Sequence, residues 1–267
     1  MQSLPVLVIE HEEECPPGRL VTWAGQAHTD LDIRRCHAGD QVPTHLSEHS
    51  GYIVLGGAMS AHDDLHYPWL KDTKHLIVQA VAHAIPFLGI CLGHQLAALA
   101  LGGQVSAHPQ GPRRGIHPIA LTPAAADDPL SQTLHQGTQL LHWNKDTVTD
   151  APEHTVVLAI DDTGQIQIAR YRDTAWGVQG HPEADGSVVE RWGRDEEQPP
   201  VEGLPTPEEV TRAAQHHDHE LAADWAPFAA RFFALTQDEH RPQRVVFPRT
   251  PSTPRRSPAG ISRIARH

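Results

Sequence analysis

The chain has 267 residues and a mass of 29.3 kDa, with 39% hydrophobic residues, which allows one large domain or two small ones with a sizeable core. This composition excludes a wholly disordered chain, a collagen and a coiled coil, and no apolar run approaches the roughly 18 residues of a membrane helix. The N-terminal sequence lacks the basic and apolar regions of a secretory signal. Three cysteines are too few for a disulfide framework, so we expect a reducing, cytoplasmic location for Cys15, Cys36 and Cys91.

The net charge of −12 is unevenly distributed along the chain. Residues 241–267 hold seven arginines, five prolines and no acidic residue, so this end carries +7 and the rest of the chain carries −19. An acidic body argues against binding of nucleic acid over a broad surface. We expect residues 238–267 to form a disordered, solvated tail that packs no core, with a docking arm for an anionic partner as the alternative.

The first half of the chain alternates β-rich runs with segments of helical periodicity. The β-rich runs are residues 5–10, 31–36, 52–55 and 85–90. The helical segments are residues 17–27, 68–84 and 92–101. Strands and helices alternating at this spacing predict an α/β fold, an open and mostly parallel sheet with helices on both faces.

The second half is richer in strands, which we expect at residues 116–121, 139–143, 155–160, 165–171 and 175–179. Residues 161–164, Asp-Asp-Thr-Gly, predict a hairpin turn. After an acidic, proline-rich loop at 193–206, Thr206, Pro207 and Glu209 have the pattern of a capping box. We therefore expect a helix or helix pair over 206–237, broken or kinked at Pro227, and one domain over 1–237 with its core at 5–190.

Residues 89–95, with the sequence GICLGHQ, form the most informative segment. Cys91 stands at the turn from a buried strand to a helix, above the carboxyl edge of the sheet, where open α/β folds bind ligands. Gly89 and Gly93 permit the tight turn of a nucleophile elbow. The helix N-terminus favours the thiolate and leaves backbone N–H groups that can hold an oxyanion. Taken alone, the motif is also compatible with a buried core cysteine.

Two other strand ends carry candidate partners for this cysteine. His181 and Glu183 flank Pro182, which favours extended backbone, so their side chains point to the same side and the carboxylate can orient the imidazole. Gly56 and Gly57 close another strand and can aim backbone N–H groups into a pocket. Taken alone, the His-Pro-Glu motif could also be a surface turn, and the glycine pair could be an ordinary strand-to-loop turn. Their common position at strand ends favours one cysteine–histidine–carboxylate site.

Three blocks of the sequence resemble class I glutamine amidotransferase domains, the family with a Cys-His-Glu triad. They are residues 54–60 (VLGGAMS), 86–95 (PFLGICLGHQ) and 177–183 (GVQGHPE), and the resemblance extends over 5–190. Their order is similar to that in stand-alone members that resemble the amidotransferase part of GMP synthase. The resemblance implies a flavodoxin-like fold, and formation of glutamate and ammonia from L-glutamine through a γ-glutamyl thioester.

The resemblance also implies a role for individual residues. Cys91 attacks the side-chain amide of glutamine, His181 shuttles the proton, and Glu183 orients His181. The backbone N–H groups of Gly57 and Leu92 form the oxyanion hole. The implied substrate-binding residues are Gln95, Gly56 and Met59.

Several positions depart from the family pattern. An aromatic residue commonly precedes the His-Pro-Glu motif, whereas this chain has Gly180, for which we expect looser packing behind the histidine. Relatives usually carry His-Gly or Ser-His-like residues where this chain has Asn144 and Lys145, near the glutamine pocket. An acidic residue often stands before the glycine where this chain has Arg113-Arg114-Gly115. The substrate preference therefore stays open.

The sequence contains no phosphate-binding loop for ATP and no segment large enough for an ammonia-consuming synthetase domain. We therefore expect no cofactor, and we expect the partner that accepts the ammonia to be a separate synthetase. The alternatives are a hydrolase that cleaves a γ-glutamyl compound alone, or a catalytically silent regulatory protein. His216 and His219 could share a metal, but they have no evident third ligand, so we expect an exposed helix and no metal site.

Overall fold

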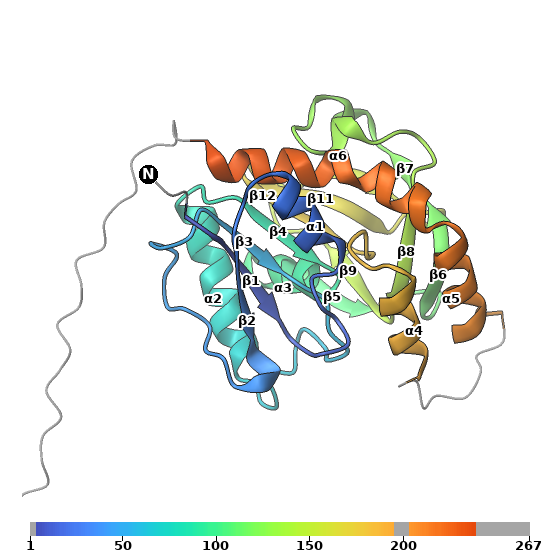
Figure 1. The fold of residues 1–267 in the computed structure, drawn as a ribbon, viewed down its shortest axis with the longest axis horizontal. Helices are drawn as coiled ribbons and strands as arrows, with labels where there is room; N and C mark the ends of the chain where they lie inside the picture. The colour runs from blue at the N-terminus through green and yellow to red at the C-terminus, as the bar shows by residue number, and fades with distance from the viewer. Residues whose placement is uncertain (1–3, 195–202, 239–267) are drawn as a thin grey trace, which may run out of the picture.

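The computed structural model of the protein describes residues 4–194 and 203–238. Its centre is an eight-stranded sheet in the order β2-β1-β3-β4-β12-β11-β10-β7 (Figure 1). The first five strands in that order run parallel, and the last three continue the sheet antiparallel. The strands are β1 (Val6–Glu10), β2 (Leu31–Arg35), β3 (Gly51–Val54), β4 (Phe87–Ile90), β7 (Ala120–Leu121), β10 (Val156–Ile160), β11 (Ile166–Arg172) and β12 (Ala175–Val178). The predicted fold class is confirmed.

Helices cover both faces of this sheet, which explains why the central strands are continuous apolar runs. In β1, Val6 and Val8 point into one core while Leu7 and Ile9 point into the other, and all four side chains are fully buried. The helices α1 (Arg19–Gln26) and α6 (Asp218–Gln237) cover the first core, and α2 (Trp69–Ala82) and α3 (Leu92–Ala100) cover the second. Figure 1 shows α6 running along one side of the sheet.

A smaller layer of strands and helices lies beside the carboxyl edge of the parallel strands. It contains two antiparallel pairs, β5 (Gln104–Ala107) with β9 (Asp146–Asp150), and β6 (Arg113–Pro118) with β8 (Gln139–Asn144). The helices α4 (Gly186–Arg194) and α5 (Pro207–His216) pack against it around a third core. Three short 3-10 helices complete the described elements, Cys36–Ala38, Pro123–Asp127 and Ser131–Thr133.

Several predicted boundaries differ from the structure. The strand expected at 116–121 is two strands, because β6 ends at Pro118 and β7 joins the other sheet. The short, polar strands β5 and β9 and the helix α4 were not predicted. The capping box is confirmed: Thr206 and Glu209 exchange hydrogen bonds of 2.8 and 3.3 Å. Residues 239–267 of the predicted tail and most of the loop predicted at 193–206 lie outside the described residues.

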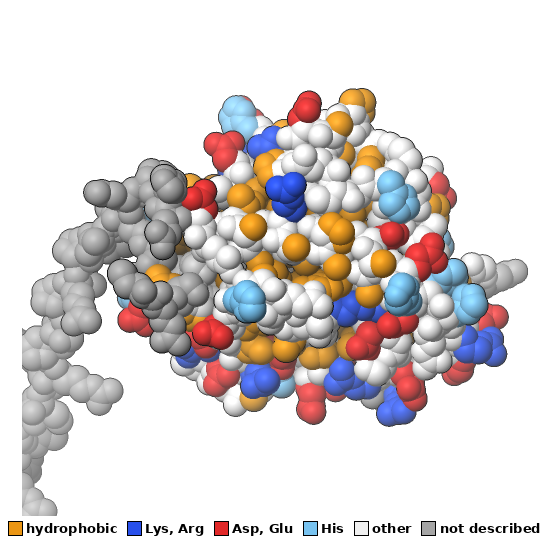
Figure 2. All heavy atoms as spheres, turned by 45° about the horizontal axis from the view of Figure 1, so that its top comes forward, with side chains coloured by type: hydrophobic (Ala, Val, Ile, Leu, Met, Phe, Trp, Pro, Cys, Tyr) orange, Lys and Arg blue, Asp and Glu red, His pale blue; other side chains and the backbone are white. Residues whose placement is uncertain are grey.

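The predicted break of the C-terminal helix at Pro227 is wrong, because α6 continues through this residue. The helical segment is interrupted instead at His217, between α5 and α6. Pro227 is exposed, and the carbonyl that loses its hydrogen-bond donor belongs to Ala223, which is exposed as well. Water can therefore replace the missing bond, while neighbouring Trp225 and Phe228 remain buried. Figure 2 shows the side of the molecule that carries α6, with hydrophobic side chains across its middle and charged ones mostly around its rim.

Replacing Pro227 with alanine is expected to raise the free energy of unfolding by about 1 to 3 kcal/mol, because the variant regains a helical hydrogen bond. Urea denaturation followed by circular dichroism measures this change. Ala234→Ser, an exposed change on the same helix, is the matched control and should alter stability by less than about 0.5 kcal/mol. A destabilised Pro227→Ala variant would contradict the explanation.

Candidate active site

Cys91 occupies a strained turn between β4 and α3, as the sequence predicts. It is the N-cap residue of α3 and has a φ of 48°, in the left-handed region that favours glycine. A Cβ at Gly89 would lie 2.5 Å from the carbonyl of Gly93, and one at Gly93 would lie 2.1 Å from the carbonyl oxygen of Val54. Only glycine fits at these two positions, so both are required for the turn that presents the sulfur.

His181 and Glu183 lie beside this turn, just beyond the end of β12. The imidazole Nδ1 and the Glu183 Oε1 are 2.9 Å apart, and both side chains are buried. His181 and Cys91 line the same cavity, and a Cβ built at Gly56 would lie close to both side chains. The structure therefore brings the three predicted residues together at one site.

The electrostatics of this group favour a charged imidazole. Burial lowers the pKa of His181, but the negative charges of Cys91 and Glu183 and the hydrogen bond to Glu183 outweigh it and raise the pKa to about 10. The imidazolium is thus the favoured form at neutral pH. It can pair with a thiolate and can donate a proton.

The glycine pair after β3 faces the same group. A Cβ at Gly56 would lie 2.8 Å from Cε1 of His181 and 3.6 Å from Cβ of Cys91, so the bare backbone fills the space beside both side chains. At Gly57 a Cβ would lie 3.0 Å from Cδ2 of Leu92. Within the described ranges, the N–H groups of Gly57 and Leu92 donate no hydrogen bond, so they are available to an oxyanion.

Glu12, which the sequence analysis missed, holds the glycine loop in place. Its Oε1 accepts a hydrogen bond of 2.9 Å from the N–H of Ala58 and one of 3.1 Å from the thiol of Cys15. Burial, followed by the charge and hydrogen bond of Glu12, raises the pKa of Cys15 well above its usual value, so this thiol stays protonated and donates. Glu12 belongs to a run of three acidic residues, a pattern typical of a solvated surface, so no sequence signal pointed to it.

Two glutamines connect the cysteine to the start of β9. Nε2 of Gln95 donates to the carbonyl oxygen of Asp146 at 3.0 Å and lies 3.5 Å from Oε1 of Gln179. Nε2 of Gln179, a residue that was not predicted, lies 3.8 Å from Sγ of Cys91. Asn144 donates to the same Asp146 oxygen at 3.0 Å, and its own Oδ1 is buried with no hydrogen-bond partner.

The looser packing expected at Gly180 is not found. A Cβ at this position would lie 2.4 Å from Cγ of Leu140 and 2.5 Å from the carbonyl oxygen of Leu141, so the space is already filled. The aromatic ring beside the histidine comes instead from Trp192 on α4, whose centroid is 4.6 Å from that of His181. Leu140 and Trp192 thus explain why a glycine precedes the histidine here.

A cavity of about 1020 Å³ opens over this group. Among the predicted residues, Cys91, His181, Gly57, Met59 and Gln95 line it, whereas Gly56, Leu92 and Glu183 lie behind its surface. Four residues that depart from the family pattern also line it: Arg113, Arg114, Asn144 and Lys145. Further acidic and aromatic side chains line it as well: Glu12, Glu14, Asp63, Asp146, Trp143 and Trp192. These four departures therefore change the lining of the cavity itself.

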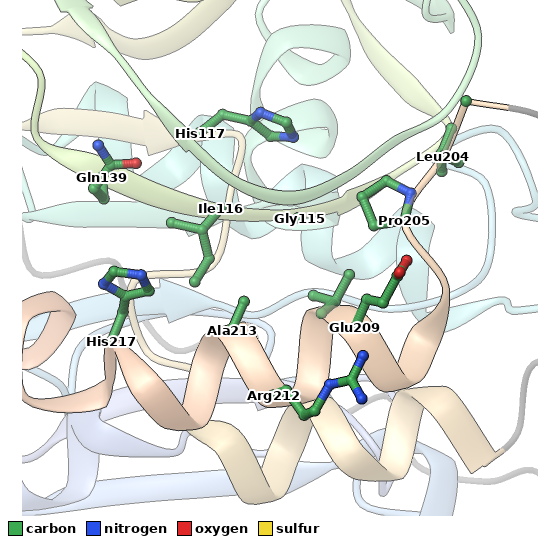
Figure 3. A pocket seen from close by; sticks show the side chains of 12 residues that line it. Gly115, Ile116, His117, Gln139, Leu204, Pro205, Glu209, Arg212, Ala213 and His217 are labelled. Carbon is green, nitrogen blue, oxygen red and sulfur yellow. The ribbon is translucent and has the colours of Figure 1, made fainter.

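A second cavity, of about 880 Å³, lies between β6 and α5. Figure 3 shows Ile116 of β6 pointing toward Ala213 of α5 across it. None of the predicted site residues lines this space. Among residues 4–194 and 203–238, no group of three His, Cys, Asp or Glu side chains could hold a metal ion, and no helix is long and apolar enough to cross a membrane.

The chain belongs to the class I glutamine amidotransferase family, whose model matches residues 20–191. It is 32% identical to the glutamine amidotransferase-like protein YfeJ of Salmonella typhimurium, over 68% of this chain and 77% of YfeJ. A component of the glutamine-hydrolyzing GMP synthase of Methanocaldococcus jannaschii is 33% identical over 51% of this chain and 65% of that component. Gamma-glutamyl peptidase 4 of Arabidopsis thaliana is 25% identical over 54% of this chain and 57% of the peptidase.

The fold agrees with that of a glutamine amidotransferase of known structure. The crystal structure of a glutamine amidotransferase from Thermotoga maritima superposes with a TM-score of 0.75 and 23% sequence identity. The match covers 87% of this chain and 99% of the other. The flavodoxin-like arrangement predicted from the resemblance is therefore confirmed.

Replacing Gly56 with alanine is expected to slow alkylation of Cys91 by iodoacetamide at least tenfold at neutral pH, because the new methyl group displaces the imidazole that stabilises the thiolate. Mass spectrometry of the peptide containing Cys91 measures the rate. Gly25→Ala is the matched control, since Gly25 is exposed and a Cβ there meets nothing within 4 Å. Equal rates in the two variants would show that Gly56 does not set the geometry.

Proposed function

We propose that this protein hydrolyses the side-chain amide of L-glutamine to glutamate and ammonia through a γ-glutamyl thioester on Cys91, and passes the ammonia to a separate synthetase. One observation carries the proposal: Cys91 and His181 line one cavity beside two unused backbone N–H groups, and Glu183 lies 2.9 Å from the His181 imidazole. The match to the amidotransferase family supports the same chemistry.

In the first half of the reaction, the Cys91 sulfur attacks the amide carbon, and the carbonyl electrons move to the oxygen. The N–H groups of Gly57 and Leu92 stabilise the resulting negative charge. When the carbonyl re-forms, the carbon–nitrogen bond breaks, and His181 donates its proton to the leaving nitrogen. Ammonia departs and the acyl group remains on the sulfur as a thioester.

In the second half, water attacks the thioester and His181, now neutral, accepts the proton of the water. The carbon–sulfur bond breaks, glutamate leaves, and the imidazolium and thiolate are restored. Glu183 holds Nδ1 of His181, so Nε2 is the nitrogen that exchanges protons with sulfur, amine and water. The residues of this chain supply every proton transfer in the cycle.

The rest of the cavity can hold the amino-acid end of glutamine. Met59 and Gln95 line it and are the proposed substrate contacts, while Gly56 contributes space rather than a side chain. The buried, unpartnered Oδ1 of Asn144 is an acceptor suited to the α-ammonium group. Asn144 would thus act in place of the family's usual residue.

A separate ammonia acceptor is supported by the likeness to the archaeal GMP synthase component, which by its name is one part of a larger synthase. We propose a cytoplasmic location, in line with three buried cysteines that are all free thiols. The second candidate function is hydrolysis of a γ-glutamyl amide or peptide without any partner. The cavity volume and the likeness to a gamma-glutamyl peptidase favour this candidate.

A diazo-ketone analogue of L-glutamine is expected to alkylate Cys91 and to abolish ammonia release, because the analogue occupies the substrate cavity and reacts with the nucleophile. The adduct is located by peptide mass spectrometry, and ammonia release from glutamine is measured before and after treatment. The control variant Cys36→Ser changes a buried cysteine in the opposite core. Its Cys91 should be alkylated to the same extent as in the native protein. An intact protein that gains no adduct at Cys91 would rule out the proposed reaction.

Cys91→Ala is expected to lower the pKa of His181 from about 10 toward its ordinary value of 6.5, because the interaction with Cys91 that raises this pKa is removed. The imidazolium would then be lost at a lower pH than in the native protein. NMR titration of ¹⁵N-labelled histidine measures the shift, with Cys36→Ala as the control. An unchanged His181 titration would mean that no thiolate–imidazolium pair exists.

A further inference from the structure

We infer that the wall of the cavity next to His181 is a subsite for an aromatic amine, so that the preferred substrates are γ-glutamyl amides whose nitrogen carries an aromatic group. This inference rests on the thioester chemistry of the proposed function and deepens its second candidate, hydrolysis of a γ-glutamyl amide without a partner. It begins from the proton transfer, because the group that leaves must lie within hydrogen-bond distance of the imidazole that protonates it. Whatever the nitrogen carries therefore extends over the side of the cavity that adjoins His181.

That side is built from two tryptophans and an arginine. The ring of Trp192 packs on His181 with a centroid separation of 4.6 Å, and the ring of Trp143 meets Trp192 edge to face at 5.7 Å. The guanidinium carbon of Arg114 lies 4.5 Å from the centroid of the Trp143 ring. All three residues line the same cavity as Cys91. They form a continuous aromatic and cationic wall that starts at the imidazole.

Hydrogen bonds to backbone carbonyl oxygens hold the wall in place. The indole N–H of Trp192 donates to the carbonyl oxygen of Glu14 at 2.7 Å, and Arg114 donates to the carbonyl oxygen of Pro205 at 3.3 Å. Trp143 and Arg114 are also directly paired across β8 and β6. A preorganised wall of this kind binds a flat ligand without first losing side-chain freedom.

Release of ammonia does not require an aromatic wall. A leaving ammonia molecule makes no apolar contact, and glutamine is far smaller than a cavity of about 1020 Å³, since cavities of roughly 300–1,000 Å³ hold drug-sized ligands. Aromatic faces and an arginine stacked on one of them favour a flat, apolar group in the remaining space. The chemistry of the wall therefore indicates an aromatic amine.

The reaction balances without any further reactant. Cys91 forms the same γ-glutamyl thioester, the carbon–nitrogen bond breaks, and the amine leaves with the proton from His181. Water then hydrolyses the thioester and returns the proton to His181. The products are glutamate and the free aromatic amine.

The test compares two secondary amides that differ in the aromatic ring, γ-L-glutamyl-benzylamide and γ-L-glutamyl-ethylamide, with glutamine as a third substrate. We expect kcat/KM for the benzylamide to exceed that for the ethylamide about tenfold or more in the native protein. Trp143→Ala should reduce this ratio about tenfold, and Trp143→Phe should restore most of it. Val78→Ala, a partly exposed change on α2, should leave the ratio unchanged.

The outcomes separate this inference from the proposed function. If Cys91 forms a thioester with glutamine but the two secondary amides react equally or not at all, the aromatic subsite is wrong and the glutaminase remains. A benzylamide preference that survives Trp143→Ala also overturns the subsite. If none of the three substrates acylates Cys91 in the folded protein, the proposed function fails with it.

Discussion

The charge on one buried imidazole controls what this site can do. Burial alone lowers the pKa of His11 and of His94 to about 3, so both of these histidines are neutral. His181 is equally inaccessible, yet its pKa rises to about 10. The difference lies in its neighbours, because only His181 among these three is flanked by a cysteine and a glutamate whose negative charges offset the loss of hydration. Without these two neighbours, the same fold would hold another inert histidine.

The topology of the sheet explains why these neighbours meet. The glycine pair, the cysteine and the histidine follow β3, β4 and β12, which lie next to one another in the sheet although β12 is far from the other two in sequence. All three strands run parallel, so their carboxyl ends meet at one edge. Glycines then set the final distances. At Gly56, Gly89 and Gly93 a single added carbon would overlap the imidazole or the backbone, so the reactive geometry depends on the absence of side chains.

The strand ends could be predicted from the sequence, whereas the contacts between distant residues could not. The ends of β3, β4 and β12 carry motifs of buried strand followed by small residues, and these local patterns predicted Cys91, His181 and Glu183. Glu12, Gln179 and Trp192 carry no such signal, because each contributes through a contact with a residue far away in the chain. The effect of Gly180 was misjudged for the same reason, since Leu140 and Leu141 fill the space beside it. Pro227 was misjudged because its exposure to water was unknown.

The residues that perform the reaction differ from those that select the substrate. Acyl transfer to a cysteine needs the thiolate, the imidazolium and two N–H donors, and this requirement is the same whether ammonia or a larger amine leaves. The identity of the amine is decided by side chains that do not touch the bond that breaks, such as Trp143 and Arg114. These residues lie on β6 and β8, in a layer attached to the edge of the main sheet. A change in that layer can therefore alter the leaving group without disturbing the strands that hold the nucleophile.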